Sequence, residues 1–194
     1  MIIGIDIDNV ITTTTEAVLE YINERLETSF VIEDVKQYYI ENLLDEKYRW
    51  IVADAFHNSQ MWKKVKPVEG AFETIKKLID DGHEVYFCTS TLPENVRKKI
   101  KYIIRNSNLS YQFVSKRMIN IHNKQLLNLD ILIDDCLSNL VGNRNYYSIC
   151  LDYPWNRIDE GCTIEGFYRA KNWNEIYEFI SKGIEEYFYK ELDF

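Results

Sequence analysis

Two aspartates, Asp6 and Asp8, follow an apolar run at the start of the chain, in the stretch MIIGIDIDN. Such a run predicts a buried strand of a parallel sheet. Because successive residues of a strand point to opposite faces, both carboxylates can lean to one side while Ile7 points back into the core. Two converging acids can hold a hard cation, or can divide nucleophilic attack and proton transfer between them. An isolated Asp-x-Asp is more often a polar turn, so the chemistry depends on partners further along the chain.

Candidate partners for this pair occur downstream, each shortly after a predicted strand. They are Thr89 with Ser90, then Lys124, and then Asp134 with Asp135. The carboxyl ends of parallel strands meet at one edge of a sheet, so we expect these side chains to gather there. Carboxylates suit Mg²⁺, and hydroxyls and helix-start amides suit phosphate oxygens. A lysine balances the charge on a phosphoryl group during transfer.

Taken singly, most of these residues have a simpler interpretation. Thr89 and Ser90 could merely cap a helix, and Lys124 could lie on the surface, as most lysines do. Asp134 and Asp135 are harder to explain in this way, because two acids that end the apolar run ILI need a partner when they are buried. The combination therefore predicts a site for Mg²⁺ and a phosphoryl group, although no single residue does.

The elements that must position these residues follow an α/β pattern. Beyond residue 67, strand-like apolar runs alternate with amphipathic helices, which predicts a parallel sheet with helices on both faces. Strands are expected near 1–8, 83–90, 111–115, 130–135 and 146–151, and helices near 70–81, 93–106 and 174–189. Residues 16–66 hold two further amphipathic helices and are predicted to be a helical insertion, so that 1–15 and 67–194 form the core.

Composition narrows the class of protein. The 194 residues are 46% hydrophobic, with a formal charge of −8, which argues against binding nucleic-acid polymers or anionic membranes. No basic leader with a long apolar segment and no membrane-length apolar run occurs, so a soluble, cytoplasmic protein is expected. The four cysteines lack metal-ligand spacing and are expected to be reduced and mostly buried: Cys88, Cys136, Cys150 and Cys162.

The order of the motifs resembles the haloacid dehalogenase (HAD) superfamily of phosphatases. DIDN comes first and FCTS second. Lys124 follows, ten residues before Asp134 in ILIDD. Within that superfamily the chain is similar to the 5′(3′)-deoxyribonucleotidases, the cytosolic type C nucleotidases, with VKPVEGA and YPWNR as further similar segments. The resemblance implies a HAD-like Rossmannoid parallel sheet flanked by helices, with a small helical cap inserted after the first strand.

The same resemblance implies a role for each motif residue. Asp6 would be the nucleophile that forms an aspartyl-phosphate, and Asp8 would protonate the leaving alcohol and then activate water. Mg²⁺ would be held by Asp6, by the backbone carbonyl of Asp8, and by Asp135, with Asp134 acting directly or through water. Phosphate would be bound by Thr89, Ser90 and Lys124.

The cap would choose the substrate, which the resemblance implies to be a small phosphorylated molecule such as a deoxyribonucleoside monophosphate. Trp62 could stack on a base and Lys63 could attract the anion, although ordinary helix packing is the more frequent role of an aromatic residue there. Asn9 stands where the family usually has glycine, and asparagine tolerates the same turn. The oligomeric state stays open, a homodimer included.

Three other functions are compatible with parts of the pattern. A HAD phosphatase could act on another small substrate such as a sugar phosphate. A regulatory module could take up a phosphoryl group, although the Asp-x-Asp spacing and the long insertion argue against a receiver domain. A catalytically silent relative would have no need for the full set of charged groups.

Overall fold

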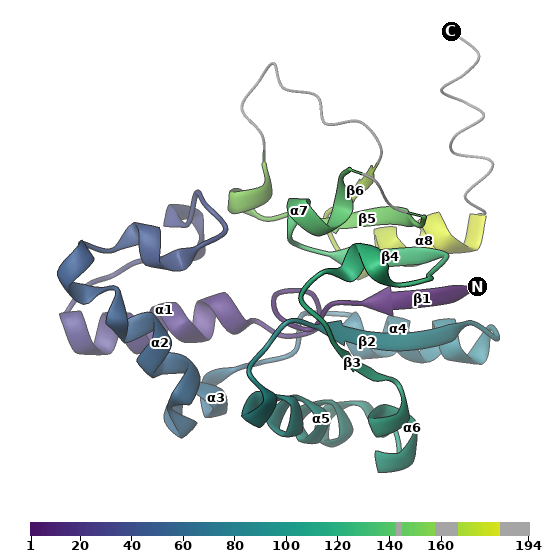
Figure 1. Cartoon of the computed structure of the whole chain (residues 1–194), viewed down its shortest axis with the longest axis horizontal. Coiled ribbons are helices and arrows are strands. Elements are labelled where there is room, and N and C mark those ends of the chain that lie inside the picture. The colour runs from purple at the N-terminus through teal and green to yellow at the C-terminus, as the bar shows by residue number, and fades with distance from the viewer. Residues whose placement is uncertain (143–144, 158–166, 183–194) are drawn as a thin grey trace, which may run out of the picture.

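The computed structural model describes residues 1–142, 145–157 and 167–182, and it contains one parallel sheet within these ranges (Figure 1). The strands lie in the order β3-β2-β1-β4-β5-β6, with every neighbouring pair parallel. Their bounds are β1 (Ile2–Ile5), β2 (Glu84–Thr89), β3 (Met118–Asn120), β4 (Ile131–Asp134), β5 (Tyr147–Leu151) and β6 (Phe167–Ala170). This sheet confirms the predicted α/β class.

Alternation along the strands divides the apolar side chains between two faces of the sheet. Ile3, Ile5, Ile131 and Ile133 belong to a large cluster that also contains apolar residues of α4 (Ala71–Asp80), α5 (Pro93–Ser107) and α8 (Trp173–Lys182). Leu132 and neighbours on the other face pack with α7 (Leu137–Leu140) in a smaller cluster. The sheet is thus covered on both faces, as parallel sheets require.

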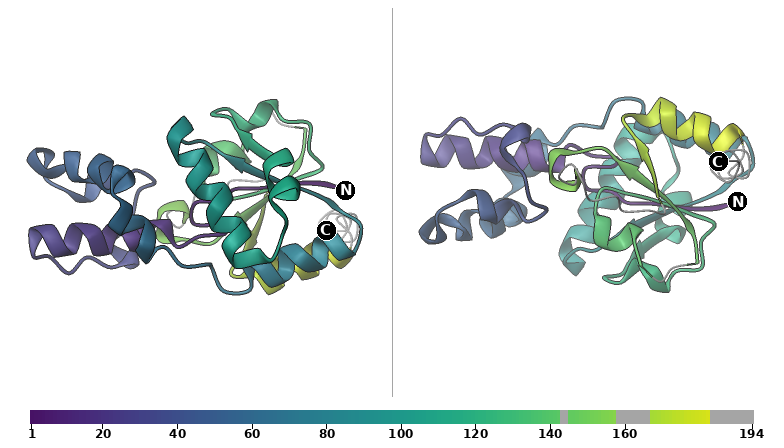
Figure 2. Two further views of the ribbon diagram at one scale, coloured as in Figure 1. Left: turned by 90° about the horizontal axis from the view of Figure 1, so that it is seen from below. Right: turned by 90° about the horizontal axis from the view of Figure 1, so that it is seen from above.

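Residues between β1 and α4 form a separate helical layer. It consists of α1 (Thr14–Leu26), α2 (Trp50–His57) and α3 (Ser59–Lys64), with short 3₁₀ turns at Ile32–Asp34, Ile40–Leu43 and Glu46–Tyr48. Figures 1 and 2 show this helical segment beyond the carboxyl ends of the strands, extending away from the sheet. It has an apolar cluster of its own, to which Trp155 of the core contributes from the turn Pro154–Asn156.

One predicted strand is wrong, and two observed strands were not predicted. The expected strand at 111–115 is wrong, because these residues lie in α6 (Tyr111–Lys116), where the Ser110 hydroxyl accepts a hydrogen bond from the Phe113 amide at 3.1 Å. The third strand is instead β3, which the sequence analysis missed, as it missed β6. The helix expected at 174–189 is observed as α8, and its predicted end lies outside the described residues.

Two expectations from composition can be compared with the structure. Cys88, Cys136 and Cys150 are free and buried, as expected, whereas Cys162 lies outside the described residues. Among the helices of the described ranges, none combines the length and the apolar character that crossing a membrane demands.

Candidate active site

The chain turns sharply at the end of β1, and this turn presents Asp6 and Asp8. The Asp6 amide continues the pairing with β4 by donating to the Ile133 carbonyl at 2.9 Å. Ile7 then points into the core with 1% of its surface exposed. The backbone closes on itself when the Ile11 amide donates to the Ile7 carbonyl at 3.0 Å. Asn9 occupies the left-handed region with φ of 58°, so it makes the turn that a glycine would make.

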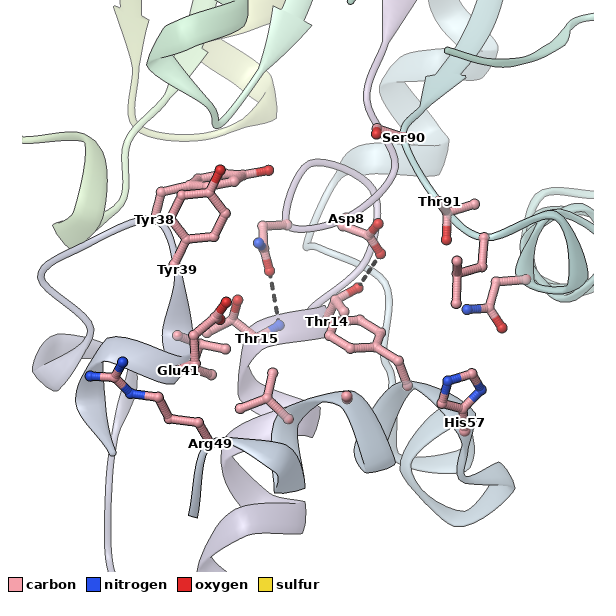
Figure 3. A pocket seen from close by; sticks show the side chains of 17 residues that line it. Asp8, Thr14, Thr15, Tyr38, Tyr39, Glu41, Arg49, His57, Ser90 and Thr91 are labelled. Atoms are coloured by element: carbon pink, nitrogen blue, oxygen red, sulfur yellow. Dashed lines mark hydrogen bonds between the residues drawn. The ribbon is translucent and has the colours of Figure 1, made fainter. Parts of the chain in front are cut away.

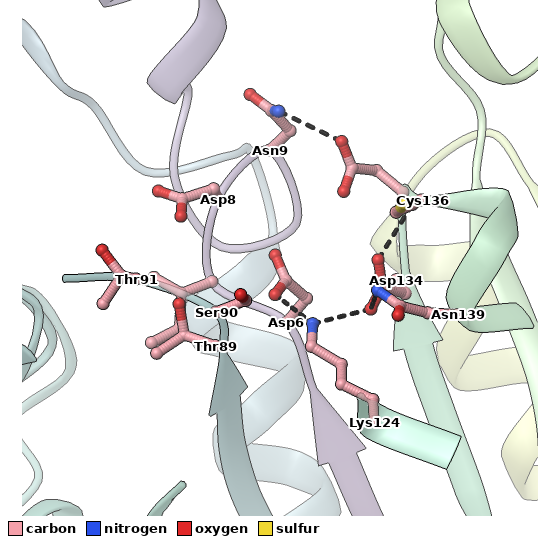
Figure 4. A network of polar contacts seen from close by, with 12 residues as sticks. Asp6, Asp8, Asn9, Thr89, Ser90, Thr91, Lys124, Asp134, Cys136 and Asn139 are labelled. Atoms are coloured by element: carbon pink, nitrogen blue, oxygen red, sulfur yellow. Dashed lines mark hydrogen bonds and ion pairs between the residues drawn. The ribbon is translucent and has the colours of Figure 1, made fainter. Parts of the chain in front are cut away.

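Three buried aspartates meet at this turn. Carboxylate oxygens of Asp6, Asp134 and Asp135 all lie within 4.8 Å of one another. Lys124, from the 3₁₀ turn Lys124–Leu126, reaches into the group, forms an ion pair with Asp6 and donates to Asp134 Oδ2 at 2.7 Å (Figure 4). A cluster with three acids and one lysine holds more negative than positive charge.

The environment of this cluster shifts the ionisation of its members. Burial raises the pKa of Asp6 to about 7, although the Lys124 ammonium pulls it down. Burial also raises the pKa of Asp135 well above its usual value, and Asp134 adds to the effect. Burial alone would lower the pKa of Lys124, but the carboxylates of Asp134 and Asp6 outweigh it and raise that pKa. Lys124 is therefore charged, and a cation bound at the cluster would stabilise the ionised forms of Asp6 and Asp135.

Asp135 is oriented by two donors. Asn9 Nδ2 and Trp155 Nε1 each donate to its Oδ2 at 3.1 Å. The Asn9 side chain is itself fixed, because its Oδ1 accepts from the Thr15 amide at 2.9 Å. Within the described ranges, Asp135 Oδ1 accepts no hydrogen bond, so that oxygen is free to bind a cation. Asp134, in contrast, accepts from Lys124, from Asn139 Nδ2 at 3.0 Å and from the Cys136 amide at 2.8 Å.

Asp8 has different partners from Asp6. Its Oδ1 accepts from the Thr14 hydroxyl at 2.8 Å, and its Oδ2 forms an ion pair with Lys99 of α5. Lys99 also donates to Thr89 Oγ1 at 2.8 Å, at the end of β2. The Asp8 side chain is therefore turned away from the three buried aspartates, toward α1 and α5.

The two hydroxyls at the end of β2 differ in exposure. Thr89 is fully buried, whereas Ser90 is exposed, and its Oγ lies 3.3 Å from His122 Nδ1. Figure 4 shows both residues on the β2 side of Asp6, across from Asp134 on β4. The four groups that the sequence analysis selected therefore surround one point at the carboxyl edge of the sheet.

A cleft of about 760 Å³ lies between this edge of the sheet and the helical segment, and Asp8 and Ser90 are the members of these groups that line it. Figure 3 shows its lining, which includes Asp8, Asn9 and Ser90 from the core and Tyr38, Tyr39 and Phe56 from the helical segment. The rings of Tyr38 and Tyr39 meet edge to face, with their centroids 5.4 Å apart. A mixed polar and aromatic cleft of this size can hold a small organic molecule.

The two expected cap contacts do not line this cleft. Trp62 packs edge to face on Phe56 at 6.5 Å between centroids, and its Nε1 donates to the Phe56 carbonyl at 2.8 Å. Lys63 is exposed and donates to Gln60 Oε1 at 3.3 Å. The structure thus gives Trp62 a packing role and places Lys63 at the solvent.

Comparison with known proteins agrees with this geometry. The family model described as "5' nucleotidase, deoxy (Pyrimidine), cytosolic type C protein" matches residues 1–184. The chain belongs to this family. A protein named 5'(3')-deoxyribonucleotidase from Bacillus subtilis (strain 168) is 27% identical over 183 residues, covering 90% of this chain and 95% of the relative. A protein of the same name from Clostridium acetobutylicum is 26% identical over 177 residues, covering 89% and 91%.

Solved structures show the same fold in more distant proteins. A hydrolase from Pseudomonas syringae matches with a TM-score of 0.58 and 11% identity, covering 94% of this chain and 98% of that chain. A HAD family hydrolase from Deinococcus radiodurans R1, solved with bound phosphate and sodium, matches with a TM-score of 0.57 and 12% identity, covering 93% and 95%. This type C nucleotidase therefore shares the fold of HAD family hydrolases, which is the fold that the motifs predicted.

One charged residue of the nucleotidase site was missed by the sequence analysis. Lys99 lies on the same face of α5 as Val96 and Ile103, and its side chain is only 2% exposed. A lysine in line with apolar helix positions is unusual, because lysine is almost never buried without a partner. That position in the helix was the signal that could have identified it.

Proposed function

We propose that this nucleotidase is a Mg²⁺-dependent phosphomonoesterase that forms an aspartyl-phosphate on Asp6. The observation that supports this proposal is the position of Asp6, buried beside Lys124 and two further aspartates and two residues before Asp8, which lines the cleft. A nucleophile and a separate proton donor thus lie at one edge of the sheet, which is the arrangement needed for covalent phosphoryl transfer.

The acidic cluster fits a divalent cation. Its three buried carboxylates share one ammonium, that of Lys124, and buried charge without a partner is costly. We assign Asp135 Oδ1 and a carboxylate oxygen of Asp6 as ligands, with the backbone carbonyl of Asp8 as a third. Asp134 would act through water, since its oxygens already accept from Lys124, Asn139 and the Cys136 amide.

Oxygen ligands of this kind suit Mg²⁺, which retains part of its water shell and binds substrate phosphate. When bound, the cation supplies positive charge to the phosphate oxygens during transfer. Lys124 supplies a second, permanent positive charge from the opposite side of Asp6.

Asp6 and Asp8, in the turn that follows β1, would have separate roles in the reaction. Asp6 Oδ1 is held by Lys124, which leaves Oδ2 to attack phosphorus. The bond between phosphorus and the ester oxygen breaks, and Asp8 gives its proton to that oxygen. In the second step Asp8 takes a proton from water, the water oxygen attacks the phosphoryl group, and the Asp6 carboxylate is released with inorganic phosphate. Thr89 and Ser90 would bind the phosphate oxygens.

The helical segment, residues 16–66, is proposed to act as a cap that selects the substrate. It contributes Tyr38, Tyr39 and Phe56 to the cleft, and aromatic rings offer a stacking surface to a nucleobase. The names of the bacterial relatives support a deoxyribonucleoside monophosphate as substrate. Free, buried cysteines suit a reducing compartment, so we place the enzyme in the cytoplasm.

The test is phosphate release from a panel of dUMP, dTMP, ribonucleotides and sugar phosphates with Mg²⁺, for the wild type beside Asp6→Asn. Strong release from deoxynucleotides that is lost in Asp6→Asn and in EDTA, and restored by added Mg²⁺, is the expected result. Release from sugar phosphates alone would keep the mechanism and reject the nucleotide substrate. Activity retained in Asp6→Asn, or without any divalent cation, would contradict the mechanism itself.

A further inference from the structure

The ion pair between buried Lys99 and half-buried Asp8 is not used by the mechanism above. The Lys99 side chain is 2% exposed, and its Nζ contacts Asp8 Oδ2 and, at 2.8 Å, Thr89 Oγ1. We propose that Lys99 is a positioning residue that holds Asp8 for proton transfer to the leaving group. This inference rests on the proposed phosphatase function, and it assigns Lys99 as the residue that orients the proton donor, Asp8.

Stability alone does not explain a lysine at this position. Ile103, one turn further along α5, is fully buried in the main apolar cluster. An apolar side chain at position 99 would continue that cluster, and replacing a buried ion pair by apolar residues is often neutral or stabilising. The ammonium instead joins the turn after β1 to the end of β2, the two segments that bear the proton donor and the phosphate-binding hydroxyl.

Both carboxylate oxygens of Asp8 are held by neighbouring side chains. Oδ2 accepts from the Lys99 ammonium, and Oδ1 accepts from the Thr14 hydroxyl at 2.8 Å. A hydroxyl can donate or accept, so Thr14 can follow the change in Asp8. Asp8 and Thr14 both line the cleft, where the leaving group would lie (Figure 3).

Lys99 would act in the first step, in which Asp8 loses its proton to the leaving group. As the bond between phosphorus and the ester oxygen breaks, Asp8 gives its proton to that oxygen and becomes a carboxylate. Lys99 keeps all its protons, and its charge stabilises the carboxylate that has just formed. Lys99 therefore matters for leaving groups that need a proton, such as the sugar hydroxyl of a nucleotide, and little for nitrophenolate, which departs without one.

The experiment compares the first, phosphoryl-transfer step with dUMP and with p-nitrophenyl phosphate in Lys99→Met, measured in a single turnover as release of the nucleoside or of nitrophenolate. Since positioned proton transfer is worth about 10²-fold or more, we expect this rate to fall about 100-fold for dUMP and less than about threefold for p-nitrophenyl phosphate. Lys99→Arg, which keeps the charge, should recover part of the loss with dUMP. Lys101→Met, which removes an exposed lysine from the same helix, should change neither rate by more than about twofold.

Combining Lys99→Met with Asp8→Asn tests whether Lys99 acts through Asp8. In Asp8→Asn the proton donor is already absent, so adding Lys99→Met should lower dUMP turnover by less than about threefold further. Full additivity of the two losses would overturn the proposal.

Equal losses for dUMP and p-nitrophenyl phosphate in Lys99→Met would assign the lysine a structural role and also overturn the proposal. If that variant does not fold, Lys99→Gln, which keeps a polar group in the site, carries the same comparison. Absence of phosphate release by the wild type from both substrates would refute the proposed function instead, so the two failures are distinguishable.

Discussion

At the scale of single residues, Asn9 serves two purposes in the site. Its backbone makes the left-handed turn with φ of 58°, and its side chain donates to Asp135 Oδ2 at 3.1 Å. A glycine would make the turn equally well but could not orient Asp135. Groups that orient metal-binding side chains commonly affect metal affinity by about 10-fold or more.

Asn9→Gly should therefore weaken Mg²⁺ binding by about 10-fold while keeping the fold, because only the amide that fixes Asp135 is removed. The affinity can be measured by calorimetry, and independently by the rise in melting temperature that Mg²⁺ produces. Asn108→Gly is a matched control, since Asn108 has φ of 57° and ends α5 on the surface. Equal Mg²⁺ affinity in Asn9→Gly and the wild type would show that Asp135 needs no such support.

Residue types and spacing were enough to predict most of the acidic cluster. Asp6, Asp134 and Asp135 were selected because each follows an apolar strand, and strand ends of a parallel sheet meet by topology. Lys99 could not be selected in this way, since it reaches the site from the second turn of a helix. Cleft residues such as Tyr38 were also missed, because their position depends on irregular chain whose path no local pattern specifies.

At the scale of elements, the helical segment forms one wall of the cleft. Its aromatic contribution comes from Tyr38 and Tyr39, just before the 3₁₀ turn Ile40–Leu43, and from Phe56 of α2. Tyr39 is 64% exposed and available to a ligand. Base stacking on an aromatic ring contributes about 1–3 kcal/mol per base, which corresponds to about 5- to 150-fold in affinity.

Tyr39→Ala is expected to raise KM for dUMP about 10-fold, since a stacking surface is lost, while kcat changes little. KM for p-nitrophenyl phosphate should change less than that for dUMP, because this substrate lacks a base and a sugar. Steady-state kinetics with both substrates measure the difference. Trp50→Ala provides the control, because Trp50 is exposed on α2 and does not line the cleft. A rise in KM of equal size in both variants would argue against base contact at Tyr39.

The elements that the sequence analysis misjudged share a physical cause. Residues 111–115 alternate like a strand, but the Ser110 cap and the short chain between α5 and β3 favour one helical turn there. Strands β3 and β6 are short and only partly buried, at the two edges of the sheet, so they lack the continuous apolar runs of β1 and β4. Central strands are therefore predictable from hydrophobicity, whereas edge strands depend on the neighbours they pair with.

At the scale of the whole molecule, the net charge of −8 makes paired acids important for stability. Asp152, after β5, accepts from Arg157 Nη2 at 2.8 Å and from Arg169 Nη1 at 2.9 Å, which ties the end of β5 to β6. Burial acts to raise the pKa of Asp152, but the bonds from Arg157 and Arg169 outweigh it and hold that pKa below its usual value.

A lowered pKa in the folded state means that the unfolded chain takes up the proton first as pH falls. Asp152 therefore contributes stability above about pH 4, and that contribution is lost at more acidic pH. Asp152→Asn should lower the free energy of unfolding by about 1 kcal/mol at pH 7, because the arginines are partly exposed and solvent screens the pairs. The difference from the wild type should shrink below about pH 4.

Urea unfolding at pH 7 and at low pH measures this difference. Asp80→Asn is the control, since Asp80 pairs with Lys76 at 2.5 Å on the surface and both side chains are mostly exposed. That pair should contribute close to nothing. A deficit of the same size at both pH values in Asp152→Asn would contradict the electrostatic explanation.

The most direct test of the whole account is to trap the covalent intermediate. Asp8→Asn lacks the base that activates water, whereas p-nitrophenyl phosphate needs no acid for its first step. Mixing this variant with p-nitrophenyl phosphate and Mg²⁺, quenching in acid and mapping peptides by mass spectrometry should reveal a phosphoryl group on the peptide that contains Asp6. The double variant Asp6→Asn with Asp8→Asn should show none. A phosphoryl group on another residue, or turnover without any adduct, would contradict the assignment of Asp6 as the nucleophile.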